Sequence, residues 1–232
     1  MTRNFFLFIC LFAGCQQVLM SQSFNQKDAQ GNRNGQWRKF HEGTKQLRYE
    51  GTFVHGQEIG VFKFYDTDSG KQPSATKSYT AGSERIDVSY FRKGGTKLSE
   101  GQVKGRKKEG KWKYFHPDGI TIMTIEYYKS DLLEGERTVY FANGQIAQKQ
   151  TFVLGKEEGI DAHFSEKGIQ LKMYTFQKGR LEGNSKIWNT DGNLLIEGRY
   201  KDNKKHGTWK YFVNGKLDKE LKYPQNKLGV QH

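Results

Sequence analysis

Cysteine is nearly absent from this 232-residue chain, and its two cysteines, Cys10 and Cys15, both lie close to the amino terminus. Everything after residue 15 therefore has no thiol. This excludes a disulfide framework and a cysteine-based metal site from the rest of the chain.

The amino-terminal region also lacks an apolar run long enough to cross a bilayer. Phe5–Ala13 is an unbroken apolar stretch of nine residues, and it follows a short positive region that contains Arg3. A transmembrane helix needs about 20 residues, whereas a secretory signal peptide has an apolar region of about this length. We therefore predict a signal peptide over residues 1–22 and export to the bacterial cell envelope.

Two cleavage sites fit this leader. The sequence Phe12-Ala13-Gly14-Cys15 resembles a bacterial lipobox, although Phe12 stands where leucine is usual. Lipidation of Cys15 would give a membrane-anchored lipoprotein. Cleavage near Ser21 or Ser23 would instead give a periplasmic or secreted protein. In either case residues 23–33 are expected to form a polar linker, which acts as a spacer.

Catalytic motifs are missing too. The chain has no G-x-S-x-G, no H-E-x-x-H, no Walker loop and no dinucleotide fingerprint. Its six histidines are scattered without local ligand pairing. We therefore expect no enzymatic activity, no cofactor and no metal.

Positive charge, in contrast, is abundant: 38 Lys and Arg against 25 Asp and Glu give a net charge of +13. The basic clusters lie beside predicted turns, which favours anionic lipid or polysaccharide over nucleic acid as a charged partner. The other interpretation is that lysines solvate exposed strand edges and turns. The candidate contact residues are Lys107, Lys108, Lys204 and Lys205.

The most informative feature that is present is a spaced repeat. A glycine, often preceded by Glu, returns roughly every 24 residues, and Asp87 takes the one missing place. A fixed period of this length indicates stacked supersecondary units. Each of these anchor glycines is expected to separate one hairpin from the next. They are Gly35, Gly60, Gly110, Gly135, Gly159, Gly183 and Gly207.

Each unit has the same internal order. An aromatic residue follows the anchor by five positions, as at Tyr65 and Phe115, and Trp112 and Trp209 follow it by two. Turn pairs such as Asn143-Gly144 come next, and then a second strand-like segment. The sequence therefore predicts an all-β fold: an elongated antiparallel meander of about eight 24-residue hairpins over residues 34–229. In the second and third units, the 27-residue spacing, Pro73 and Asp87 at the anchor predict a bulge or local irregularity.

This pattern resembles the MORN repeat (membrane occupation and recognition nexus). It is closer to the bacterial MORN-variant proteins that carry the label YwqK-like antitoxin. The segments Glu109–Gly135 and Glu182–Gly207 match best. The resemblance implies a hairpin-repeat sheet and a role in protein contact or membrane association. It also implies an antitoxin-like or immunity-like role as one alternative.

Two further side-chain sets could act in binding or in packing. The glutamates before four anchors (Glu109, Glu134, Glu158 and Glu182) could form an acidic ladder that binds cations or a basic partner, or could pair with cations across the sheet. The aromatic residues could fill the core or form an exposed strip flanked by lysines. Our hypothesis is a non-enzymatic, exported scaffold that binds an unidentified protein partner. The alternatives are binding of anionic lipid or polysaccharide and neutralisation of a toxin.

Overall fold

The structure is a computed structural model that describes residues 23–224. Its strands are β1 (Gly35–Phe40), β2 (Leu47–Val54), β3 (Gln57–Phe64), β4 (Ala75–Tyr79), β5 (Arg85–Phe91), β6 (Lys97–Lys104), β7 (Lys107–Phe115), β8 (Ile122–Lys129), β9 (Leu132–Leu133), β10 (Gly135–Tyr140), β11 (Ile146–Val153), β12 (Lys156–Phe164), β13 (Gln170–Gln177), β14 (Arg180–Leu181), β15 (Gly183–Trp188), β16 (Leu194–Lys201), β17 (Lys204–Val213) and β18 (Lys216–Tyr223).

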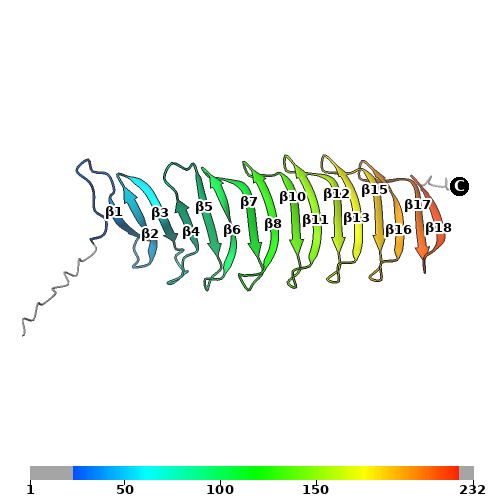
Figure 1. Cartoon of the computed structure of the whole chain (residues 1–232), viewed down its shortest axis with the longest axis horizontal. Coiled ribbons are helices and arrows are strands. Elements are labelled where there is room, and N and C mark those ends of the chain that lie inside the picture. Colours follow the sequence, from blue (N-terminus) through cyan, green and yellow to red (C-terminus); the bar gives the residue numbers. More distant parts are fainter. Residues whose placement is uncertain (1–22, 225–232) are drawn as a thin grey trace, which may run out of the picture.

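These strands form one open antiparallel sheet in which each strand pairs with its neighbours in the chain (Figure 1). The two-residue strands β9 and β14 are arms that precede β10 and β15. The other sixteen strands make eight hairpins, so the predicted all-β meander is confirmed. No helix that could cross a membrane occurs in the described part of the chain.

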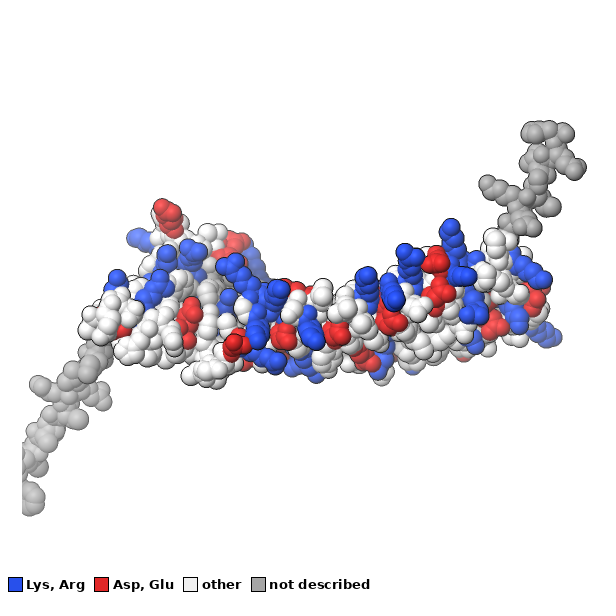
Figure 2. All heavy atoms as spheres, turned by 90° about the horizontal axis from the view of Figure 1, so that it is seen from above, with Lys and Arg blue, Asp and Glu red and all other residues white. Residues whose placement is uncertain are grey.

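The two long edges of the sheet carry different turns. At one edge, two-residue turns such as Leu154-Gly155 join the strands, and we call this the short-turn edge. At the other edge, connections of about five residues predominate, and the predicted turn pair Asn143-Gly144 lies in one of these. Figure 2 looks down on the array, which is bent along its length and carries Lys and Arg side chains from end to end.

The anchor glycines lie inside the strands or at their first residues, so the prediction that they separate hairpins is wrong. All seven have positive φ, between 66° and 110°. Gly60, Gly110, Gly159 and Gly207 sit at bulges within β3, β7, β12 and β17. Between β6 and β7, for example, Gly101 alone faces the three residues 110–112. A bulge of this kind needs the left-handed backbone that glycine adopts at low cost.

The irregularity predicted for the second and third units is present at Pro73 and absent at Asp87. The register of β4 with β5 is unbroken, and Asp87 lies directly opposite Ser78, so there is no bulge at the missing anchor. The irregular part is the connection of residues 65–74, which contains Pro73. Proline has no N–H to donate to a ladder, which is consistent with its place in a loop.

The first described residues pack against β1. The N–H of Asn25 donates to the carbonyl of Gln36 at 2.8 Å, and the Trp37 indole donates to the carbonyl of Gln26 at 3.0 Å. The Arg38 guanidinium lies 4.0 Å from the Phe24 ring centre. Over its described residues, the segment expected to act as a polar linker therefore covers the edge of the first strand.

Candidate functional site

One face of the sheet holds the aromatic core, and we call it the aromatic face. Its largest buried side chains are Trp112, Trp209 and Phe62, each exposed by 2% or less. A glycine on the preceding strand faces each of them: Gly101, Gly198 and Gly51. A Cβ atom on any of these glycines would lie 2.3–2.4 Å from the ring. The ring therefore occupies the volume that a side chain on the preceding strand would take.

The same volume is filled differently in the unit that begins at Gly183. There Ser185 stands two residues after the anchor, and Tyr174 on the preceding strand β13 takes the glycine position. In this unit the large side chain therefore comes from the preceding strand and the small one from the strand of the anchor, which reverses the Trp–Gly arrangement. Ser185 is 1% exposed and its hydroxyl has no hydrogen-bond partner in the structure. A buried hydroxyl without a partner costs about 1–3 kcal/mol.

Replacing Ser185 with Ala should therefore raise the free energy of unfolding, by about 1 kcal/mol. The substitution removes only the unsatisfied oxygen and leaves the packing of the Tyr174 ring unchanged. Urea unfolding of the two proteins measures the difference. Thr138→Ala is the matched control, because the buried Thr138 hydroxyl donates to Glu136 at 2.7 Å and its loss should lower stability. Equal effects in the two variants would contradict the explanation.

A cation from two residues before the anchor lies over the Trp112 and Trp209 clusters, and another lies over Trp37 in the first unit. The Lys108 ammonium is 4.7 Å from the Trp112 ring centre and donates to the Tyr114 hydroxyl at 2.6 Å. The Lys205 ammonium is 4.2 Å from the Trp209 ring centre. The Arg33 guanidinium takes the same place over Trp37, at 5.0 Å. Burial raises the pKa of the Tyr114 phenol, so it stays neutral as an acceptor for Lys108.

The four lysines predicted as contact residues therefore divide into two pairs. Lys108 and Lys205 are partly buried and held against aromatic rings. Lys107 and Lys204 are exposed at the short-turn edge and make no ion pair within residues 23–224. The alternation of side chains along a strand separates the two pairs. Arg33 was not predicted from the sequence, although it stands two residues before the anchor Gly35 and Trp37 follows that glycine by two residues.

Between the Trp112 and Trp209 clusters the aromatic face becomes polar. A chain of hydrogen bonds links Tyr114, Tyr128, Glu126, Arg137, Gln148, Asp161 and His163 across five strands. Arg137 and Glu126 face each other where other units have Trp and Gly, with Nε and Oε1 3.0 Å apart. Asp161 is buried and accepts from both Gln148 and His163. These charged groups have partners, as buried charges must.

The opposite face, which we call the polar face, carries a continuous cross-strand row with one residue from each of the sixteen long strands. Register places these residues side by side from end to end of the sheet. They are Arg38, Glu50, Lys63, Thr76, Ser89, Glu100, Lys113, Ile125, Thr138, Lys149, Ala162, Met173, Lys186, Glu197, Lys210 and Glu220.

Three carboxylates in this row each lie between two cations. Glu50 contacts Arg38 at 3.2 Å and Lys63 at 3.5 Å. Glu100 contacts Lys97 and Lys113, and Glu197 contacts Lys186 and Lys210. Most of these side chains are a quarter to a half exposed, so each pair contributes about 0–1 kcal/mol. These ion pairs therefore add little to the free energy of unfolding, and the row is of interest as a surface that carries charges at regular intervals.

Glu50 also makes the folded sheet sensitive to alkaline pH through Tyr65. Burial, together with the hydrogen bond that Tyr65 donates to Glu50, raises the pKa of this phenol to about 12. In the unfolded chain the phenol has a pKa of about 10. Between pH 10 and 12 only the unfolded state loses this proton, so stability should be complete below pH 10 and fall as pH rises. Urea unfolding at about pH 9 and pH 11 measures this, and a Tyr65→Phe variant should lose less stability across the interval. A stability unchanged between the two pH values would contradict the assignment.

Within residues 23–224, the glutamates before four anchors make no cross-sheet ion pair. Each accepts the backbone N–H of a turn residue in the following hairpin, over distances of 2.8–3.0 Å. The donors are Ser130, Leu154, Lys178 and Asp202, which all have positive φ. Asn34 does the same for His55. The ion-pair interpretation of this glutamate is therefore wrong, because its carboxylate caps a turn and joins adjacent repeats.

Glu158→Ala should lower the free energy of unfolding by about 1 kcal/mol, since the N–H of Lys178 then loses a charged acceptor that lies 2.8 Å away. Glu166→Ala is the matched control, because this exposed side chain lies in a five-residue turn and should have little effect. Chemical denaturation and hydrogen exchange at Lys178 would measure the change. Equal stabilities of the two variants would contradict this role.

Two histidines and Arg92 also act structurally, by linking adjacent units. His41 and His116 contact the carbonyls of Tyr65 and Tyr140 in the next unit, at 2.8 Å and 3.1 Å. Arg92 donates to the carbonyl of Phe115 at 2.7 Å in the same kind of link. Within the described chain no group of three or more His, Cys, Asp or Glu side chains could hold a metal ion. Cys15 lies outside the described residues.

Comparison with known families agrees with this geometry in part of the chain. Residues 108–129, 133–153 and 181–202 match the family model described as MORN repeat variant. No curated protein matches the chain. The structure and these matches together define an open β-hairpin repeat protein, three segments of which are similar to the MORN repeat variant. MORN repeats occur in binding proteins and are generally non-catalytic.

Proposed function

We propose that this chain is a non-enzymatic scaffold that binds a protein partner along the polar face. The cross-strand row carries this proposal, because an open sheet presents its side chains at regular intervals over sixteen strands. Arrays of this kind gain affinity by repeating modest contacts along an extended surface. An antitoxin-like role would be one form of this activity, with a toxin as the partner.

Capture from an envelope extract tests the scaffold. Immobilised protein should retain a partner saturably. Charge reversal in the row, Lys149→Glu, should weaken capture by about tenfold. Lys167→Glu is the matched control, because this residue carries the same charge in a turn outside the row. Absence of saturable capture, or equal loss in the two variants, would exclude binding through this face.

We further propose export to the cell envelope, with anchoring through Cys15 as the leading form. The support is the sequence of the leader alone. Fatty-acid labelling of the wild type and Cys15→Ser, followed by membrane fractionation, tests it. Label that is lost on substitution supports the anchor. Soluble export that the substitution does not change would favour cleavage near Ser21 or Ser23 instead.

Binding of anionic lipid or polysaccharide through the short-turn edge is a second candidate function. The supporting observation is a set of exposed cations there that make no ion pair among the described residues: Arg106, Lys107, Lys129, Lys156, Lys178, Lys201 and Lys204. Binding to anionic phospholipid vesicles should fall steeply with salt. The double variant Lys107→Glu/Lys204→Glu should weaken it further, and salt-independent binding would exclude this function.

A further inference from the structure

Two hollows on the polar face occupy equivalent positions four repeats apart. The first, of about 510 Å³, is lined by Asp87, Val88, Ser89, Glu100, Gly101, Gln102, Lys111 and Lys113. The second, of about 350 Å³, is lined by Asn184, Ser185, Lys186, Glu197, Gly198, Arg199, Thr208 and Lys210. Every residue of the second hollow stands 97 positions after its counterpart, as Gly198 does after Gly101.

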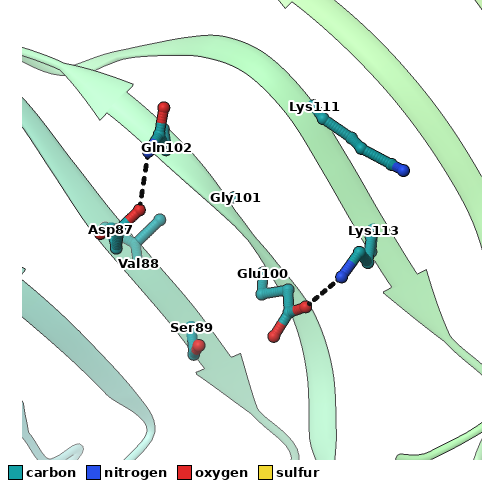
Figure 3. A pocket seen from close by; sticks show the side chains of 8 residues that line it. All are labelled: Asp87, Val88, Ser89, Glu100, Gly101, Gln102, Lys111 and Lys113. Carbon is teal, nitrogen blue, oxygen red and sulfur yellow. Dashed lines mark hydrogen bonds and ion pairs between the residues drawn. The ribbon is translucent and has the colours of Figure 1, made fainter.

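The Trp–Gly packing accounts for both hollows. Trp112 and Trp209 fill the space above Gly101 and Gly198 on the aromatic face. On the reverse side each glycine lies between longer polar side chains, which alternate to the polar face and form the walls. Figure 3 shows this for the first hollow, with Gly101 between the side chains of Glu100 and Gln102.

The cations in the hollows are only partly neutralised. In the first, Glu100 holds Lys113 at 3.0 Å, Asp87 accepts from Gln102 at 2.9 Å, and Lys111 has no ion-pair partner among the described residues (Figure 3). In the second, three cations and one carboxylate line the hollow. Lys186 and Lys210 lie 3.7 Å from Glu197, and Arg199 makes no ion pair within residues 23–224. Both hollows can therefore accept an anionic group by charge-assisted hydrogen bonds.

The surface between the hollows favours a polypeptide over a sugar polymer. Tyr127 and Ile160 lie on the polar face between them, exposed by 40% and 56%. Such side chains can pack against apolar residues of a peptide. Neither hollow is lined by an aromatic ring on which a sugar could stack. Eight inter-strand steps of about 4.8 Å separate the hollows by about 38 Å, which an extended peptide spans with about 12 residues.

We propose that the two hollows together bind one extended acidic polypeptide segment, which has carboxylates near both ends and apolar residues between them. This rests on the proposed function as a protein-binding scaffold and identifies the chemical class of the partner. Simultaneous binding at both hollows makes the second contact intramolecular, so a segment with two acidic ends should bind much more tightly than one with a single acidic end.

Fluorescence anisotropy with synthetic peptides tests the proposal on the folded array. The probe is a labelled peptide of about 14 residues with three glutamates at each end and Gly, Ser and Leu between them. The comparison peptide has glutamine in place of the glutamates at one end. The first should bind at least about tenfold more tightly. Lys111→Glu and Arg199→Glu should each remove this advantage. Lys204→Glu, the charge-matched control outside both hollows, should keep it.

Equal affinity for the two peptides would overturn the proposal, and so would an equal effect of all three substitutions. It would also be overturned if polygalacturonate bound more strongly than the peptide with two acidic ends and Lys111→Glu and Arg199→Glu weakened that binding. Circular dichroism of each variant checks that the sheet is intact. Failure here is distinct from failure of the scaffold function. If only the acidic-peptide proposal fails, an envelope partner is still captured saturably, but its capture does not depend on Lys111 and Arg199. If the scaffold function fails, no partner is captured.

Discussion

Gly101→Ala is expected to lower the free energy of unfolding by about 3 kcal/mol, although it adds only one methyl group. The new Cβ would lie 2.4 Å from the Trp112 ring, which is 1% exposed and has no free space to move into. Urea unfolding followed by circular dichroism measures the loss. Gly207→Ala is the matched control: φ is +69° there and nothing lies within 4 Å, so only backbone strain of about 1 kcal/mol is expected.

An exchange of the two residues gives a stricter test of the same packing. The pair Tyr174 and Ser185 shows that the large side chain can come from the preceding strand. The double variant Gly101→Tyr/Trp112→Ser should therefore be more stable than either single variant, because the ring is restored from the opposite side. A double variant that is no better than the less damaging single one would contradict the shared-volume explanation.

Lys108→Met is expected to cost about 2 kcal/mol, which is unusual for a lysine on a repeat surface. The ammonium lies 4.6–5.2 Å from the ring centres of Trp112, Tyr114 and Tyr128 and donates a hydrogen bond to the Tyr114 hydroxyl. Methionine keeps most of the apolar stem and removes the charge, so the loss reports the cation–π contact and the hydrogen bond.

The adjacent Lys107→Met is the control for this prediction. Lys107 is exposed and should change stability by less than about 0.5 kcal/mol. Thermal or urea unfolding of both variants gives the comparison. Similar losses in the two proteins would mean that the aromatic cluster does not hold Lys108. The outcome also bears on lipid binding, because only Lys107 of this pair is free to contact an anionic surface.

The sequence predicted the repeat, the strand content and the eight hairpins well, because these depend on local chemistry. Turn pairs such as Asn143-Gly144 and the aromatic spacing are visible one unit at a time. The bulge at the anchor glycine was not predicted, since it depends on two strands pairing with unequal numbers of residues. Glu158 was misread for the same reason: its acceptor role requires the turn of the next hairpin, twenty residues later.

The candidate surface could be predicted less well than the fold. Lys107 and Lys108 look equivalent in sequence, and only the structure shows that Lys107 is exposed whereas Lys108 lies over Trp112. The glycines at 51, 101 and 198 were not singled out, although each stands eleven residues before its aromatic partner. The eleven-residue spacing could have predicted this packing. A glycine that faces a large ring leaves room for that ring, so the two residues fill one volume between them.

The sequence by itself determined that this protein is an all-β array of eight hairpins, because period, turn chemistry and aromatic spacing are properties of each unit. The tertiary structure decided which side chains form the core and which form a surface. It did so through cross-strand register: a bulge of two residues sets which aromatic ring meets which glycine, and side-chain alternation then places the charged row on the other face. Register is a relation between strands, and no single unit contains it.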